Sequence, residues 1–221
     1  MSLKTQTTLA EMATTHPTAA RVFHRHRLDF CCGGRRSLSE ACQERGLDAA
    51  TIIVEIENEP TSDRDLARWD EADVNELIQH ILDRYHEPAR PEIARLAQMA
   101  VKVEAVHAER PDVPRGLAAQ LTRMVQEIDE HFCKEEQVLF PMVLRGHGAM
   151  AGAPIHVMGQ EHDDHGENLR RVRALANDLV PPADACATWR ALYLGLEQFE
   201  LELMEHIHLE NNVLFPKILG H

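Results

Sequence analysis

Two stretches of this 221-residue sequence share one pattern: His131-Phe-Cys-Lys-Glu135-Glu-Gln-Val-Leu-Phe-Pro141 and His206-Ile-His-Leu-Glu210-Asn-Asn-Val-Leu-Phe-Pro216. Both have the form H-x-x-x-E-x-x-V-L-F-P. On a helix, residues i and i+4 lie on one face with their Cβ atoms about 5–6 Å apart, so each His and Glu can point to the same place. The pattern therefore predicts two helices that each present an imidazole and a carboxylate.

The duplication extends beyond these stretches. Glu127 and Glu202 each stand four residues before the repeated His. Upstream, His86 precedes His131 by 45 residues, and His162 precedes the second repeated His by 44. Self-similarity of this kind indicates a repeated structural unit. We therefore predict two copies of one helical hairpin, related by a pseudo-two-fold axis, with their ligands facing each other.

Apolar residues at helical spacing predict four long helices. The first begins at Asp70 or Asp73, and Pro88 and Pro91 are expected to kink it soon after His86. The others are expected at about residues 114–139, 154–179 and 183–214, and the V-L-F-P tails are expected to pack and then stop their helices. Long helices with short connections predict an all-α fold, an up-and-down four-helix bundle.

Residues 1–59 predict a small helical domain ahead of the bundle. Thr8-x-x-Glu11 and Ser37-x-x-Glu40 are capping-box patterns, and Gly46 is a suitable helix end. The polar stretch 60–69 contains Pro60 and is expected to be a linker, because proline and small polar residues mark connections. The bundle then spans residues 70–221.

Charge and apolar content narrow the classes of partner. The formal net charge is −13, whereas a nucleic-acid-binding protein needs a basic face, so no nucleic-acid partner is expected. No stretch approaches the roughly 18 apolar residues that span a bilayer, so no membrane partner is expected. We see no signal peptide and expect a cytoplasmic protein. The five cysteines form an odd set with two adjacent members, which favours reduced thiols.

The repeated pattern predicts a metal centre. His86 continues the core-facing stripe of its helix, and His162 should occupy the matching place, which gives four imidazoles and two carboxylates. One metal would not need both carboxylates, whereas two metals can share them. Imidazole suits iron and zinc, and bridging carboxylates fit iron or manganese. A lone His on an apolar face is more often a core residue, but the duplication favours metal. The expected ligands are His86, His131, Glu135, His162, His206 and Glu210.

Several nearby residues have open roles. Glu127 and Glu202 either hydrogen-bond a ligand imidazole from one turn away or line the core without a direct role. His165, three residues after His162, is either a fifth His ligand or not a ligand. Glu130, Glu161 and Glu205 each precede a ligand His and are expected to face solvent.

The stretch Phe30-Cys31-Cys32-Gly33-Gly34-Arg35-Arg36-Ser37 is the second unusual feature. Adjacent cysteines rarely form a disulfide with each other. The two arginines and the following helix N-terminus favour thiolates of lowered pKa. Such an exposed sulfur pair could take electrons, bind iron or grip a damaged cluster. The alternative is a tight turn with incidental cysteines.

With these residues in place, the chain closely resembles the bacterial iron–sulfur cluster repair di-iron proteins, the RIC family. The resemblance covers essentially the whole chain. Besides the two repeats, it rests on Asp-Phe-Cys-Cys-Gly-Gly at 29–34, Arg-Tyr-His at 84–86 and Glu-His-Asp at 161–163. It implies a Cys-Cys-Gly-Gly domain joined to a hemerythrin-like bundle, whose two oxo-bridged iron ions are held by the six expected ligands.

The resemblance also implies roles for those ligands. Glu135 and Glu210 would bridge the irons. By analogy with hemerythrin, His86 and His131 would serve one iron, and His162 and His206 the other. Pro88 and Pro91 depart from an uninterrupted first helix and bear on the pose of His86.

The function implied is the repair of iron–sulfur clusters damaged by oxidative or nitrosative stress, by donation of iron to client proteins, with Cys31 and Cys32 as candidate thiols for transfer or redox chemistry. Two alternatives stay open: an enzyme that reduces NO to N₂O at the di-iron site, and a hemerythrin-like sensor that binds O₂ or NO. The sequence also leaves open the client proteins, a monomer or a homodimer, and the domain arrangement.

Overall fold

The structure is a computed structural model that describes residues 3–61 and 67–220. Part of the predicted linker, residues 62–66, lies outside the described residues. Across the described ranges the regular elements are helices, with one isolated bridge between Thr8 and Ser37, so the predicted all-α class is confirmed. The chain divides into two compact units, Met1–Gln79 with Met204–His221, and His80–Leu203.

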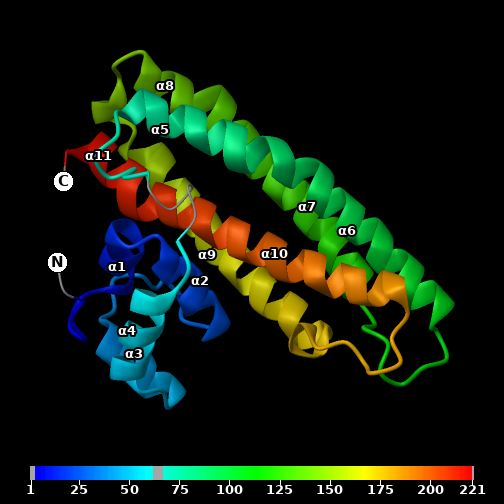
Figure 1. Ribbon diagram of the computed structural model, residues 1–221. Coiled ribbons are helices and arrows are strands. Elements are labelled where there is room, and N and C mark those ends of the chain that lie inside the picture. The colour runs from blue at the N-terminus through cyan, green and yellow to red at the C-terminus, as the bar shows by residue number, and fades with distance from the viewer. Residues whose placement is uncertain (1–2, 62–66, 221) are drawn as a thin grey trace. The chain divides into compact units, whose positions relative to one another are not determined.

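The first unit contains a cluster of short helices, whose boundaries follow the predicted caps. Ser37 and Glu40 form a complete capping box, and Gly46 ends its helix in the left-handed conformation. Phe23 and Phe30 are fully buried at the centre of the apolar core. The four helices (Figure 1) are α1 Leu9–Thr15, α2 Thr18–Arg25, α3 Leu38–Arg45 and α4 Ala49–Asn58.

The second unit contains the long helices, which Figure 1 shows running lengthwise beside one another. They are α6 Glu87–Val106, α7 Leu117–Lys134, α9 Gly152–Leu175 and α10 Ala187–Leu209, the last of which continues into residues of the first unit. Gly195 allows α10 to approach α6 closely, because a Cβ there would lie only 2.6 Å from Leu96 Cδ2. The predicted helical bundle is confirmed.

Within residues 67–220, three π-helical turns join helical segments, each with an expected ligand at one end. His86 ends η2 Leu82–His86, which follows α5 Val74–Ile81, and Glu135 and Glu210 begin η3 Glu135–Leu139 and η6 Glu210–Leu214. A proline follows each turn within two residues, at positions 88, 141 and 216. Because proline lacks an N–H and clashes with the carbonyl four residues earlier, a wider turn just before it relieves the conflict.

These turns correct two expectations. The V-L-F-P tails do not stop their helices, since α8 Phe140–Leu144 and α11 Phe215–Leu219 continue past the prolines. The irregularity near His86 comes before that residue, not after it, and Pro91 lies inside the regular helix α6. In both places the π-helical turn absorbs the effect of the proline.

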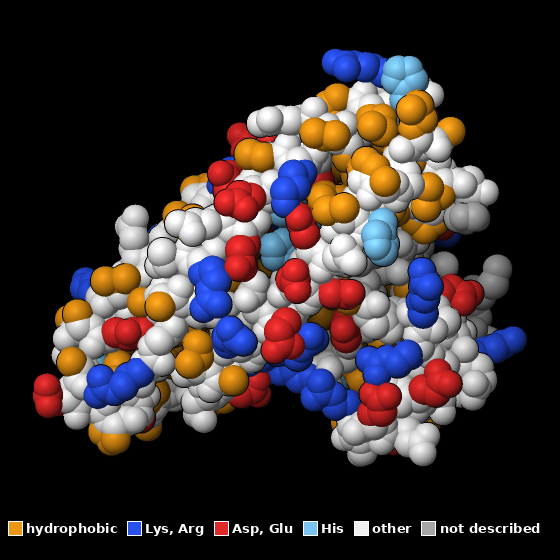
Figure 2. All heavy atoms as spheres, turned by 180° about the vertical axis from the view of Figure 1, so that it is seen from behind, with side chains coloured by type: hydrophobic (Ala, Val, Ile, Leu, Met, Phe, Trp, Pro, Cys, Tyr) orange, Lys and Arg blue, Asp and Glu red, His pale blue; other side chains and the backbone are white. Residues whose placement is uncertain are grey.

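The surface carries charge of both signs. On the face drawn in Figure 2, acidic and basic side chains are interspersed, and apolar side chains gather toward the end at which α8 lies. Val138, just before α8, and Leu144, at the end of α8, are about half exposed. Among the described helices, none combines the length and apolar character needed to cross a membrane.

Gly34 should resist even the smallest substitution. In Gly34→Ala, the new Cβ would lie 2.5 Å from the Phe30 carbonyl oxygen and 2.9 Å from Ala10 Cβ. We expect a loss of about 1–3 kcal/mol in the free energy of unfolding, measured by urea denaturation. Gly159→Ala is the matched control, because nothing lies within 4 Å of its added Cβ. Inside α9, alanine should stabilise by up to about 1 kcal/mol. Shifts of the same sign in both variants would contradict this account of the loop.

Candidate metal centre

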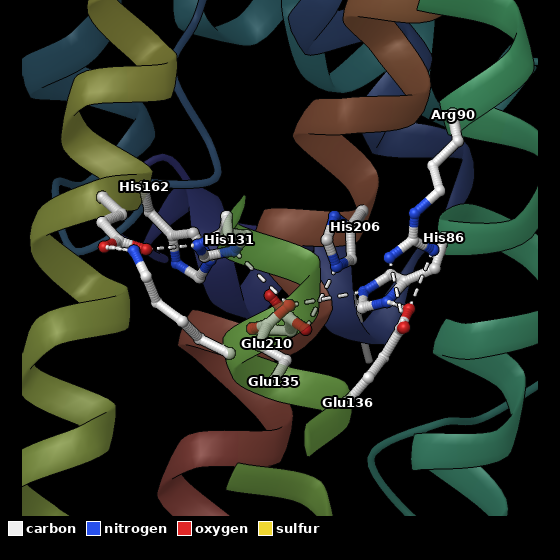
Figure 3. Close-up of polar contacts among 10 residues, drawn as sticks. His86, Arg90, His131, Glu135, Glu136, His162, His206 and Glu210 are labelled. Carbon is white, nitrogen blue, oxygen red and sulfur yellow. Dashed lines mark hydrogen bonds and ion pairs between the residues drawn. The ribbon is translucent and has the colours of Figure 1, made fainter. Parts of the chain in front are cut away.

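The six expected ligands come from the turns and helices just described. His86 ends η2, His131 lies in the last turn of α7, and His162 lies in α9. Glu135 begins η3, and α10 and η6 carry the remaining two. All six side chains are almost completely buried, with exposed fractions of 0–1%: His86, His131, Glu135, His162, His206 and Glu210. Figure 3 shows the imidazoles pointing toward the two carboxylates.

The separations of the donor atoms suit shared metal ions. The Nε2 atoms of His86 and His131 each lie 3.4 Å from the same oxygen, Glu135 Oε2. His131 Nε2 lies 3.1 Å from His162 Nε2. Two donors bound to one ion at about 2.0–2.2 Å are separated by about 3.0–3.5 Å. Donor type, burial and spacing therefore fit a metal centre.

Two overlapping groups can each hold an ion. His86, Glu135, His206 and Glu210 form one group, and His131, Glu135, His162 and Glu210 form the other. Within each group the potential ligand atoms all lie within 4.8 Å of one another. Both carboxylates belong to both groups, which is the arrangement that bridging requires.

The two groups of donors pair the histidines differently from the analogy with hemerythrin. Analogy with hemerythrin had paired His86 with His131, but in the structure His86 shares a group with His206. His131 instead shares one with His162, from the neighbouring helix α9. The reason is geometric: His131 and His162 approach each other directly through their Nε2 atoms.

Two further carboxylates orient the imidazoles from behind. Glu136 Oε1 lies 2.9 Å from His86 Nδ1, and Glu161 Oε2 lies 2.9 Å from His131 Nδ1. An acceptor at Nδ1 fixes the ring and leaves Nε2 to face a metal. Arg90 donates to both oxygens of Glu136, at 2.9 and 3.1 Å (Figure 3). Lys134 donates to Oε1 of Glu161, the oxygen that does not face His131.

The structure assigns the uncertain carboxylates differently from the sequence. Glu161, expected to face solvent, instead binds His131, so that expectation is wrong. Glu127 accepts a hydrogen bond from Asn168, and Glu202 accepts one from Arg84, so the bonds they make in the structure are not with the candidate ligands. Sequence reasoning missed Glu136, whose only signal was its place directly after a ligand.

His165 is buried, but it belongs to neither group of donors. Its ring lies 4.9 Å from that of His131, centroid to centroid. It also lines a pocket of about 310 Å³ between α7 and α9, together with Glu127, Glu130 and Glu161. The pocket lining carries five carboxylates and two cations, Lys134 and Arg171, and its net negative charge favours cations near the outer side of the candidate centre.

The cysteine loop differs from its expected state. Cys31 is only 4% exposed, and Cys32 is partly exposed. A hydrogen bond to Cys32 and burial raise the pKa of the Cys31 thiol well above its ordinary value. The expected lowering of the pKa is therefore wrong for Cys31. Of the two arginines, Arg36 pairs with Glu44, and Arg35 is exposed.

Side chains close to Glu210 in the sequence hold the cysteine loop. They and the loop belong to the same compact unit. Asn212 Nδ2 donates to the Cys31 carbonyl at 3.1 Å and also to His208 Nδ1 at 3.0 Å. Burial lowers the pKa of His208 to about 4, so the ring is neutral at pH 7. Because Nδ1 accepts, Nε2 carries the proton and faces Thr14 Oγ1 at 3.3 Å. The His208 ring also packs edge-on against Phe30.

Comparison with known proteins agrees with this geometry. The family model described as "Hemerythrin HHE cation binding domain" matches residues 77–218. A second model, described as a domain of unknown function (DUF542), matches residues 5–59. The chain is thus a member of the hemerythrin class of cation-binding proteins.

Relatives that match over nearly their whole length show which family within this class the chain belongs to. The chain is similar to the iron–sulfur cluster repair protein YtfE of Dickeya chrysanthemi, with 45% identity over 96% of both chains. It is 46% identical to the protein of that name from Musicola paradisiaca, over 96% of this chain and 95% of the relative. The Yersinia pestis protein is 45% identical over 96% of both chains. The chain belongs to the family of YtfE iron–sulfur cluster repair proteins.

Removal of the charge on Glu136 should weaken metal binding, although all six candidate ligands stay unchanged. In Glu136→Gln, the acceptor behind His86 loses its negative charge, and Arg90 keeps only Asp129 of its two ion-pair partners. Loss of such an orienting group typically lowers metal affinity by about 10- to 100-fold, and we expect a loss of that size for Glu136→Gln. The measurement is a competition titration with a chelator. Glu109→Gln changes an exposed glutamate outside the candidate centre and its acidic pocket, and it is the control. Equal affinities in the two variants would rule out the orienting role.

Proposed function

We propose that this protein repairs iron–sulfur clusters damaged by oxidative or nitrosative stress by donating iron held at the His–Glu centre. The observation that supports this most is the pair of buried donor groups that share Glu135 and Glu210. The relatives that match nearly the whole chain are named iron–sulfur cluster repair proteins. The cation-binding family model covers the residues of both groups.

The donor set fits two iron ions. Each ion would take two imidazoles, His86 with His206 and His131 with His162, and one oxygen from each bridging carboxylate. When bound, the two iron ions would be available for transfer to a client, and they would also be able to exchange electrons. The proposed ligands are nitrogen and oxygen atoms, with no thiolate among them. Borderline and hard donors of this kind hold ferrous iron less firmly than thiolates do, which suits release to a client.

The surroundings of the centre suit the exchange of cations. The pocket between α7 and α9 includes Glu161, which also binds His131. Its acidic side chains raise the local concentration of cations. Iron that passes through this pocket, in either direction, would contact its carboxylates between the solvent and the centre.

The clients are iron–sulfur proteins, and Cys31 and Cys32 engage them or carry iron to them. We assign this role to a domain of residues 1–59, with a linker at 60–69 and the iron-holding bundle at 70–221. Reduced thiols are required, so the proposed setting is the cytoplasm.

Reduction of NO is the competing function, because two adjacent ions with incomplete protein coordination could also accept small ligands. Anaerobic addition of NO to the reduced protein separates the two ideas. Formation of N₂O over many turnovers would support an enzyme, whereas cluster restoration without N₂O would support a repair protein.

Metal content gives the first test. Freshly prepared protein should contain about two irons per chain, which couple antiferromagnetically in the oxidised form, as measured by metal analysis and Mössbauer spectroscopy. Glu135→Ala removes a shared carboxylate and should lose most of this iron and the coupling. His147→Ala changes an exposed His outside the centre and should change neither. One zinc per chain, or iron without coupling, would overturn the di-iron assignment.

Cluster restoration gives the second test. Protein loaded with isotopically labelled iron is mixed anaerobically with a client whose cluster has been damaged, and transfer is followed by the label in the client. The double variant Cys31→Ala/Cys32→Ala should keep its iron but lose most of the transfer. Cys133→Ala, which changes a thiol on α7, should transfer as the unchanged protein does. Intact transfer by the double variant would remove the cysteines from the proposal.

A further inference from the structure

A third group of possible metal ligands lies outside the candidate centre, in the cysteine loop. Asp29, Cys31 and Cys32 each offer one ligand atom, and these three atoms all lie within 4.8 Å of one another. The group combines two sulfurs with a carboxylate, so its chemistry differs from that of the His–Glu groups. Cys31 is buried, while Asp29 and Cys32 are partly exposed, which leaves one side open to an incoming ion.

The distances match chelation. The two Sγ atoms are 3.7 Å apart, far beyond the roughly 2.05 Å of a disulfide bond. Cys31 Sγ lies 3.3 Å from Asp29 Oδ1. A tetrahedral ion with bonds of about 2.3 Å to sulfur and 2.0 Å to oxygen separates two sulfurs by about 3.8 Å, and a sulfur and an oxygen by about 3.5 Å. Both observed separations agree with these values to within about 0.2 Å.

The loop is also held in this conformation before any ion arrives. The Cys32 N–H donates to Asp29 Oδ1 at 3.0 Å, which orients the carboxylate toward the sulfurs. Asn212 donates to the Cys31 carbonyl, and Ala10 N–H donates to the Gly34 carbonyl at 2.8 Å. A loop fixed on both sides does not have to become ordered when it binds.

Gly33 contributes to the same arrangement. A Cβ at this position would lie 3.2 Å from Asp29 Cγ and 3.1 Å from the Asp29 carbonyl oxygen. Any larger residue would therefore push against the carboxylate that faces the two sulfurs.

We propose that Asp29, Cys31 and Cys32 form a second metal site, which binds one thiophilic divalent cation. Both thiols lose their protons to solvent as the ion binds, so two sulfur–metal bonds replace two sulfur–hydrogen bonds and two protons are released. With three protein ligands the fourth position stays open, unlike the closed tetrahedron of a structural zinc site. That position suits a donor from a second protein. The identification of the ion as ferrous iron in transit rests on the proposed function, whereas the site itself does not.

Cobalt(II) is the probe that tests the site in the full-length, anaerobically reduced protein. Cobalt bound to thiolate shows a sulfur-to-metal charge-transfer absorption, and the His–Glu groups contain no sulfur. We expect this absorption to saturate at one ion per chain, with release of two protons per ion in a weakly buffered solution. No such absorption, or an intact mass lower by two hydrogens because the thiols are joined, would overturn the proposal.

Variants assign the ligands. Cys32→Ser should abolish the absorption. Asp29→Asn keeps the size of the side chain, and it should weaken cobalt binding about tenfold or more, because even an indirect partner typically contributes that much. Cys133→Ser should leave the titration unchanged. Absorption that survives Cys32→Ser, or unchanged affinity in Asp29→Asn, would refute the assigned ligands.

The outcome is separable from that of the proposed function. Cluster restoration by a protein that shows no thiolate-bound cobalt would sink only the second site. A saturable thiolate site in a protein that restores no cluster would instead sink the proposed function.

Discussion

The structure depends on two carboxylates, Glu135 and Glu210, that have no exposed surface. Transfer of an ionised carboxylate into a protein interior costs several kcal/mol even after relaxation, so positive charge or hydrogen-bond donors must surround it. Imidazole nitrogens lie 3.1–3.4 Å from each carboxylate. Behind two of those imidazoles lie Glu136 and Glu161, which are balanced in turn by Arg90 and Lys134. Acidic and basic groups therefore alternate outward from the buried pair, and divalent ions between the carboxylates and imidazoles would complete the compensation.

The backbone is adapted to the same two residues. Glu135 and Glu210 each begin a π-helical turn, and the proline six residues later stands in the helix that follows. A π-helical turn inserts one residue relative to an α-helix, and such turns are frequent at functional sites. The V-L-F-P tail thus shapes the helix just after the ligand. Our expectation of a helix stop considered the proline alone, without the turn that accommodates it.

The difference between local and distant interactions decided what the sequence could predict. The caps at Ser37 and Gly46, the long helices and the spacing of His131 and Glu135 are properties of short segments, and the structure reproduces them. The contact of Glu161 with His131 joins two helices, so it depends on how each helix is rotated about its axis, which the spacing of residues does not specify. The position of Cys31 likewise depends on Asn212, 181 residues away, which donates to its carbonyl. The neighbouring arginines favour a lowered pKa for the Cys31 thiol, whereas its hydrogen bond to Cys32 and its burial raise that pKa.

The duplication shows how two copies of one pattern acquired different partners. Position by position, Cys133, Glu136 and Gln137 of the first copy correspond to His208, Asn211 and Asn212 of the second. Glu136 accepts at a ligand imidazole, whereas its counterpart Asn211 donates to the Cys31 carbonyl at 3.4 Å. A carboxylate could not replace the amide there, because an ionised carboxylate has no hydrogen to donate. The His and the Glu expected to hold ions are common to both copies, whereas Glu136 and Asn211 differ and bind different groups behind them. In the second copy, a single turn begins with the candidate ligand Glu210 and carries the donors that fix the loop of Cys31.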